Sequence, residues 1–210
     1  MQYIRYAIQL AVVVVIFPSI AGSYEDFFKA VRSDDVRTVS ELLNRGFDPN
    51  AVDESGQPAL TLALRDGAVR VGAALLAHPT IQPDQVNAAA ETPLMMAALK
   101  GHAALASRLL ERGAAVNRAG WSPLHYAATG PDPSIVRLLV ERGGALDARS
   151  PNGSTPLMLA AQYGSEDAVA LLLEGRADPT LRNDLGLTAA DFARRGGRDK
   201  LAARLDAARR

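Results

Sequence analysis

The sequence predicts an all-α solenoid, a stack of helix-turn-helix units joined by long loops. The first observation is a seven-residue motif, Thr92–Ala98, which returns with small changes at Ser122–Ala128 and Thr155–Ala161. With its weaker copies, the motif starts at Glu25, Pro58, Thr92, Ser122, Thr155 and Thr188, so its period is close to 33 residues. A fixed period of this size indicates repeated units that bury their apolar faces against their neighbours.

The second observation is that the signals for helix starts and ends recur at the same period. The Thr or Ser that begins the motif can cap a first helix, and the following Pro suits its first position. We expect the first helix to end on left-handed Gly67, Gly101 and Gly164, and the second to end on Gly46, Gly113 and Gly143. Arg176 stands where the fifth unit should have this second glycine.

These residues resemble the ankyrin repeat, whose pattern reads T-P-L-H-x-A-A-x-x-G-H-x-x-I-V-x-x-L-L-x-x-G-A-x-x-N. The match is closest in the units that start at Thr92, Ser122 and Thr155, and it covers roughly residues 24–210. The resemblance divides the chain into an N-terminal capping repeat at 22–57, repeats at 58–91, 92–121, 122–154 and 155–187, and a C-terminal capping repeat at 188–210.

Two kinds of loop depart from that pattern. The chain from Leu76 to Asn87 is longer than its counterpart in the first unit, which predicts an insertion at 78–84. The loops Asn87–Thr92 and Asn117–Ser122 are each shorter than the corresponding loop of the first unit. In the ankyrin family such loops form hairpin fingers, so we expect two shortened fingers here.

Residues 1–21 lie outside the repeats and resemble a secretory signal peptide. Arg5 precedes the apolar run Ala7–Phe17, and Ser19–Ala21 supplies small residues for cleavage after Ala21. The predicted location is therefore outside the cytoplasm, in the periplasm of a Gram-negative bacterium. The alternative is an uncleaved anchor in the inner membrane facing the periplasm, although the run is shorter than the roughly 20 residues of a typical span.

Composition and motifs argue against catalysis. The formal net charge is zero, which gives no field to attract nucleic acid, and the absence of Cys excludes disulfides and cysteine zinc sites. His78, His102 and His125 lack metal-ligand spacing, and no phosphate-binding loop or nucleophile motif occurs. We therefore predict no enzyme activity, no metal and no cofactor. The ankyrin resemblance implies that His125 hydrogen-bonds backbone between units.

The resemblance also implies that a protein partner binds a concave face made of finger tips and the exposed ends of the first helices. The predicted contact residues are Trp121, Tyr163, Arg118, Arg149, Gln162, Arg65, Lys100, Arg194 and Arg195. Trp121 is the only Trp of the chain and is expected to be an interface hot spot. The alternative is that it packs on its own shortened loop.

The predicted function is that of an exported, monomeric, non-catalytic module that binds a protein partner on this face. One alternative is a membrane-tethered structural scaffold that keeps its N-terminal segment. Another is an assembly factor or inhibitor of an exported enzyme. The many Arg residues of the last helix indicate a solvated capping helix or, as a further alternative, a docking site for an acidic partner or anionic lipid.

Overall fold

The computed structural model describes residues 22–208, so the predicted signal segment at residues 1–21 lies outside the described residues. The described chain consists of helices, turns and loops, with an isolated bridge between Val52 and Pro58 and no strand within residues 22–208. The predicted all-α repeat fold is thereby confirmed. Within the same residues, no helix has both the length and the apolar character needed to cross a bilayer.

The chain divides into two compact units, Met1–Ile81 and Gln82–Arg210. The first unit contains a helix at residues 22–32, α2 (Val36–Asn44), α3 (Ala59–Asp66) and α4 (Val69–Ala77). Its core includes the buried side chains of Leu62 and Leu75. Phe27 stacks on Phe47 with ring centroids 4.3 Å apart, which adds aromatic packing to that core.

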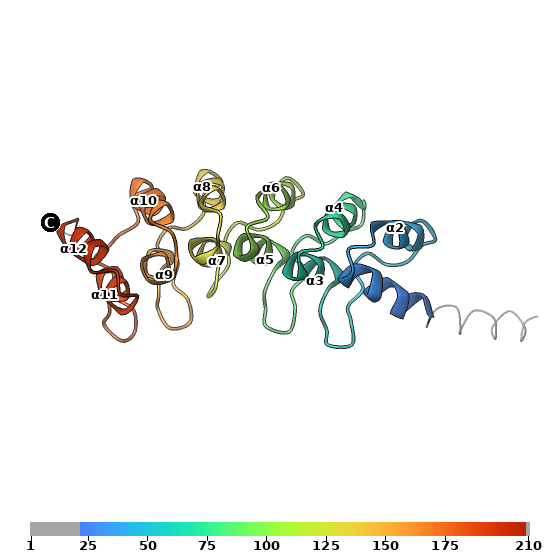
Figure 1. Ribbon diagram of the computed structural model, residues 1–210, viewed down its shortest axis with the longest axis horizontal. Helices are drawn as coiled ribbons and strands as arrows, with labels where there is room; N and C mark the ends of the chain where they lie inside the picture. Colours follow the sequence, from blue (N-terminus) through green and yellow to red (C-terminus); the bar gives the residue numbers. More distant parts are fainter. Residues whose placement is uncertain (1–21, 209–210) are drawn as a thin grey trace, which may run out of the picture. The chain divides into compact units, whose positions relative to one another are not determined.

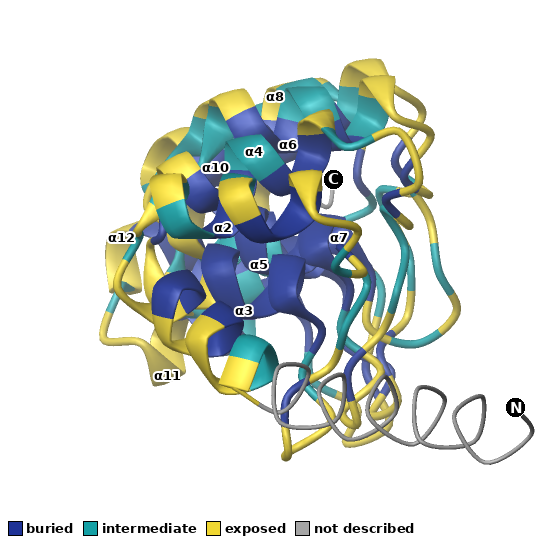
Figure 2. Cartoon of the chain, turned by 90° about the vertical axis from the view of Figure 1, so that its right-hand side faces the viewer, coloured by how far each residue is buried: buried dark blue, intermediate teal, exposed yellow. Residues whose placement is uncertain are grey.

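The second unit consists of four helix pairs in two layers (Figure 1). The pairs are α5 (Pro93–Lys100) with α6 (Ala103–Glu111), α7 (Pro123–Thr129) with α8 (Pro133–Glu141), α9 (Pro156–Tyr163) with α10 (Glu166–Glu174), and α11 (Ala189–Arg195) with α12 (Asp199–Ala207). Helices α5, α7, α9 and α11 contact one another in sequence and form the inner layer. Figure 2 shows α5 and α7 largely buried, whereas α8 carries exposed residues on its outer side.

The predicted helix starts are confirmed in the second unit. The hydroxyl oxygens of Thr92 and Thr155 accept the backbone N–H of the third helical residue, at 3.3 Å and 3.4 Å. Proline occupies the first helical position of α5, α7 and α9, where its missing N–H leaves no acceptor unsatisfied. These caps fix where each inner helix begins and therefore where each finger ends.

Gly164 was predicted to end its helix in a left-handed conformation, and this prediction was wrong. Gly67 and Gly101 are left-handed as expected, with φ of 78° and 76°. Gly164 has an extended backbone (φ −84°, ψ 178°), so it needs no conformation special to glycine. Any side chain at Gly164 would instead clash with the carbonyl oxygen of Ala128 on the neighbouring inner helix. Close packing of α9 on α7 therefore requires glycine there.

The second helix of each of these repeats ends on a left-handed residue, as predicted. This holds even in the repeat that has no glycine at that position. Gly113 and Gly143 are left-handed, with φ of 89° and 82°. Arg176 adopts the same left-handed conformation, with φ of 74°, although a Cβ makes that region unfavourable. The repeat geometry thus overrides the local preference of Arg176.

The structure corrects the prediction of two shortened fingers. A carboxylate oxygen of Asp84 accepts a backbone N–H of the following repeat at 3.0 Å, as Asn117 and Asp147 do in their own repeats. Asp84, rather than Asn87, is therefore the counterpart of Asn117. Counted from Asp84, the finger that ends at Thr92 has full length, and the chain before it contains one additional residue instead of the insertion predicted at 78–84.

Asn87 lies inside that full-length finger, at the first residue of its turn. Its backbone N–H donates to the carbonyl of Glu91 at 3.1 Å, and its side-chain oxygen accepts the N–H groups of Ala89 and Glu91. Asn183 makes the same turn in the last finger. The sequence comparison matched Asn87 by residue type, although its hydrogen bonds place it in the turn. Only the finger Asn117–Ser122 is short.

Candidate partner-binding site

The short finger lies over a shallow hollow in the second unit. The hollow has a volume of about 180 Å³ and is lined by Leu99, Trp121, His125, Tyr126, Thr129 and Leu159. These side chains come from α5, the short finger, α7 and α9, so the hollow spans three neighbouring inner helices. The fingers on either side of the short finger have full length.

Trp121 forms one wall of the hollow and stays partly accessible. Its ring meets the ring of His125 edge-on at 5.4 Å and that of Tyr126 at 6.5 Å. The side chain nevertheless remains 39% exposed. Trp121 thus combines the two interpretations of the sequence, because it packs on its own repeat and also presents apolar surface to solvent.

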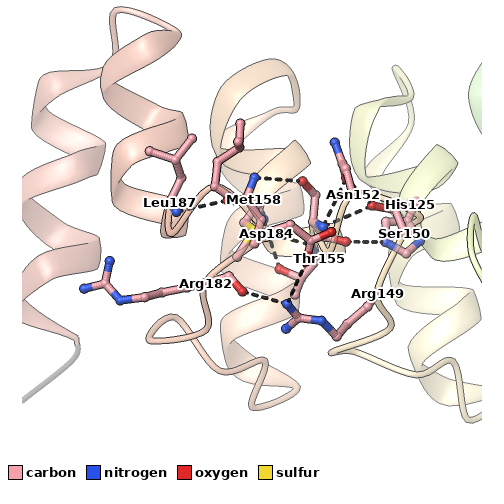
Figure 3. A network of polar contacts seen from close by, with 12 residues as sticks. His125, Arg149, Ser150, Asn152, Thr155, Met158, Arg182, Asp184 and Leu187 are labelled. Atoms are coloured by element: carbon pink, nitrogen blue, oxygen red, sulfur yellow. Dashed lines mark hydrogen bonds and ion pairs between the residues drawn. The ribbon is translucent and has the colours of Figure 1, made fainter.

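His125 lines the hollow and is hydrogen-bonded to the finger of the next repeat. Its Nδ1 accepts the backbone N–H of Ser122 at 3.1 Å, so Nε2 carries the proton and donates to the carbonyl of Ser154 at 3.0 Å. Figure 3 shows His125 beside the residues of that finger. Burial lowers the pKa of His125 below its usual value and keeps the ring neutral. The predicted hydrogen bond between units is confirmed.

Tyr126 is half-buried and lines the hollow. Its hydroxyl donates to Glu91 Oε1 at 3.0 Å, and the other carboxylate oxygen of Glu91 accepts from Asn87 at 2.8 Å. Burial, together with Glu91, raises the pKa of Tyr126 to about 12. Tyr126 therefore remains a neutral hydrogen-bond donor at physiological pH, and Glu91 is fully engaged.

In the second unit, two of the predicted contact arginines, Arg149 and Arg194, already have partners inside the molecule. Arg149 donates to the carbonyl of Arg182 at 2.7 Å and lies 3.9 Å from a carboxylate oxygen of Asp184, as Figure 3 shows. Arg194 forms ion pairs with Asp191, at 3.0 Å, and with Asp206. The Arg149 contacts join two neighbouring fingers, so a pattern read one repeat at a time could not reveal them. The Arg194 pairs lie within one helix pair.

The remaining predicted residues differ in their surroundings. Arg65 belongs to the first unit, where it pairs with Asp66 at 2.8 Å. Tyr163 is 65% exposed at the end of α9, one helical turn after Leu159. The other four are fully or partly exposed in the second unit: Lys100 ends α5, Arg118 is in the short finger, Gln162 precedes Tyr163, and Arg195 ends α11.

Sequence reasoning did not single out Tyr126 and Leu159 as surface residues of the site. Both occupy the same place in the motif, immediately before the Ala-Ala pair. The family pattern leaves that place free, which is the signal that could have identified them. Both are partly exposed and line the hollow.

The basic C-terminal region is engaged largely within the second unit. The guanidinium of Arg198 donates to the carbonyl oxygens of Ala160, Ala161 and Gly164 at 3.0, 3.1 and 2.8 Å. Arg198 thereby caps the C-terminal end of α9. Arg204 pairs with Glu166 at 2.8 Å. Residues 22–208 contain no cluster of three or more His, Asp or Glu side chains that could hold a metal ion.

A protein-family model and several known proteins match this chain. The family model described as "Ankyrin repeats (3 copies)" matches residues 27–119, 72–149, 115–183 and 131–205. An ankyrin repeat-containing protein of Treponema pallidum (strain Nichols) is 28% identical over 170 residues, which are 81% of this chain and 47% of that protein. The calmodulin-binding transcription activator CBT of Oryza sativa subsp. japonica is 48% identical over 66 residues, covering 29% of this chain and 7% of that protein.

The chain thus spans about half the length of the Treponema protein and a small part of the rice protein. Among solved structures, a similar chain occurs in the Bd0816 predatory endopeptidase from Bdellovibrio bacteriovorus in complex with immunity protein Bd3460. The TM-score is 0.72 at 24% sequence identity, covering 85% of this chain and 97% of the matched chain. This likeness concerns the fold.

Proposed function

This chain belongs to the ankyrin repeat family, and from that premise we propose that it is a non-catalytic module that binds a protein partner. The proposed binding face comprises the finger tips and the exposed ends of the inner helices, the face that the family resemblance predicts to be concave. Within that face, the proposed centre is the hollow beneath the short finger.

The observation that supports this centre best is the partial exposure of Trp121 beside an apolar hollow. Trp is enriched among residues whose truncation strongly weakens an interface. The hollow is held in place before binding, because His125 bonds to Ser154 and Tyr126 bonds to Glu91. Side chains that are already ordered lose little entropy on association, which favours tight binding from a small contact.

The proposed anchors are accordingly Trp121 and Tyr163, with Lys100 and Arg118 as charged neighbours. Arg149 and Arg194 are less suitable anchors, because a partner would first have to displace their internal contacts. We further propose that the protein is exported, on the basis of the apolar segment at residues 1–21. N-terminal sequencing of the mature protein tests this: a new N-terminus at Gly22 supports export with cleavage.

Affinity capture with the full-length chain tests the binding function. The chain carries a C-terminal tag, is expressed in a Gram-negative host, and the proteins that co-purify are identified. We expect a specific partner that is lost with Trp121→Ala while the circular dichroism spectrum stays unchanged. Val69→Ala, which truncates an exposed apolar side chain in the first unit, is the matched control. Equal capture by wild type and Trp121→Ala would count against this centre.

A second candidate is an inhibitor of an exported enzyme. Its support is the solved endopeptidase complex in which a chain of this fold occurs. If the captured partner is a hydrolase, adding the purified chain should lower its activity at a one-to-one ratio. Unchanged activity at saturating concentrations would exclude inhibition and leave the binding function as it stands.

A further inference from the structure

Two cations lie close in sequence to residues that line the hollow. Lys100 directly follows Leu99, which lines the hollow, and Arg118 precedes Trp121 by three residues in the short finger. Within residues 22–208, neither side chain forms an ion pair. Glu91, the carboxylate that reaches the hollow through Tyr126, has both oxygens occupied by internal donors.

Three other cations of the second unit are engaged in contacts within that unit. Arg194 and Arg204 each pair with carboxylates of their own unit, and Arg149 bonds to the neighbouring finger. Near the hollow, the described cations that form no ion pair are Lys100 and Arg118. Charge complementarity at the rim of an interface selects the partner and steers its approach.

The size of the hollow limits what can enter it. A volume of about 180 Å³ is below the roughly 300–1,000 Å³ of a typical small-molecule pocket. It is suited to one large apolar side chain packed against Trp121, Leu99 and Leu159. The occupant must bring this side chain on a backbone that fits between the two full-length fingers.

We propose that the occupant is an extended peptide segment with one large apolar side chain flanked by Asp or Glu. The apolar side chain fills the hollow, and the flanking carboxylates meet Lys100 and Arg118. This inference rests on the proposed function, because it specifies the chemistry of the partner at the same site. It predicts selectivity for acidic over basic sequence around the apolar anchor.

Trp121 provides a direct probe, because it is the only Trp of the chain. Three synthetic peptides of equal length are titrated at low ionic strength: a central Leu flanked by Glu, a central Leu flanked by Lys, and a central Ser flanked by Glu. We expect the Glu-flanked Leu peptide to change the Trp121 emission and to bind about tenfold more tightly than the Lys-flanked one. The Ser peptide should give no saturable change.

Charge-reversal variants separate specific from general electrostatics. In the double variant Lys100→Glu with Arg118→Glu, the preference should invert toward the Lys-flanked peptide. The control is Arg137→Glu on α8, an exposed residue of the outer layer that does not line the hollow. We expect this control to keep the wild-type preference. Thermal unfolding of each variant checks that the fold is retained.

The outcomes distinguish this inference from the function on which it rests. Equal binding of the Glu-flanked and Lys-flanked peptides, or no binding of either, overturns the proposed chemistry. If partner capture still depends on Trp121 in that case, the binding function stands and only its chemical specification fails. If Trp121→Ala alters neither capture nor the polarisation of a labelled Glu-flanked peptide, both proposals fail.

Discussion

Arg176 and Ala90 are two non-glycine residues held in the left-handed backbone region, with φ of 74° and 58°. Ala90 is the residue at the finger turn for which the first finger uses Gly56, and Arg176 ends α10 where its neighbours use glycine. The left-handed region costs a residue with a Cβ roughly 1–2 kcal/mol relative to glycine. Both positions therefore store strain that the surrounding hydrogen bonds sustain.

Replacing these residues by glycine should stabilise the protein. We expect Arg176→Gly and Ala90→Gly each to raise the free energy of unfolding by about 1 kcal/mol, since part of the gain is lost to the greater freedom of unfolded glycine. Urea unfolding followed by circular dichroism measures this. The reciprocal control, Gly113→Ala, should be destabilising. A loss of stability in both glycine variants would contradict the strain argument.

The fourth residue of the motif determines how the cap of each inner helix is completed. In α7 the ring of His125 accepts the cap N–H and also reaches the next finger. In α5 and α9 the sulfur atoms of Met95 and Met158 accept the cap N–H at 3.4 Å but offer no donor to the next finger. The repeat that carries the hollow is thus also the one in which a histidine side chain bonds to the next finger.

The C-terminal end of helix α9 is capped by a side chain from another helix pair. Its last carbonyl groups are orphaned by helix geometry and would otherwise need water or a local turn. Arg198, at the start of α12, donates to three carbonyl oxygens in and after the last turn of α9. The C-terminal capping repeat therefore stabilises the helix that carries Leu159 and Tyr163.

Removing this cap should weaken the second unit. We expect Arg198→Ala to lower the free energy of unfolding by roughly 1–3 kcal/mol, because charge-assisted hydrogen bonds to partly buried acceptors are lost. Arg195→Ala removes an exposed arginine of α11 and should change stability by about 0.5 kcal/mol or less. Chemical unfolding followed by Trp121 fluorescence compares the two. Equal effects would show that Arg198 contributes only its charge.

At the scale of the whole molecule, stability should depend on pH through His125. Burial lowers its pKa below the value of 6.5 that it has when unfolded, so the unfolded chain binds the proton more tightly. The stability associated with neutral His125 is therefore complete above about pH 6.5 and is lost as pH falls toward the folded-state pKa. Asp178 and Asp191, whose pKa values are lowered from 3.8, act only at more acidic pH.

Unfolding measured between about pH 7.5 and 5 tests this dependence. We expect the wild-type free energy of unfolding to decrease over that interval, and the His125→Gln variant to be less stable at pH 7.5 but flatter with pH. His125→Ala should likewise lose stability at neutral pH, because Ser154 and the Ser122 cap lose their partner. A wild-type melting temperature in His125→Ala would refute the structural role.

The repeated helix pairs, the caps and the register could all be predicted from the amino-acid sequence. Thr92 and Pro93 act within one turn of backbone, so their meaning can be read locally, and the period near 33 residues indicates stacking. The exposed Trp121 could also be anticipated, because the family pattern leaves its position free.

Which residues line the hollow, and which charged side chains form internal ion pairs, became clear from the three-dimensional structure. Tyr126 and Leu159 belong to different repeats, and their meeting depends on how closely α7 and α9 pack at Gly164. The assignment of Asp84 rather than Asn87 required the hydrogen bond that Asp84 makes to the next repeat. The engagement of Arg149 likewise involves a carbonyl 33 residues away. These are contacts between repeats, which a pattern read one repeat at a time does not contain.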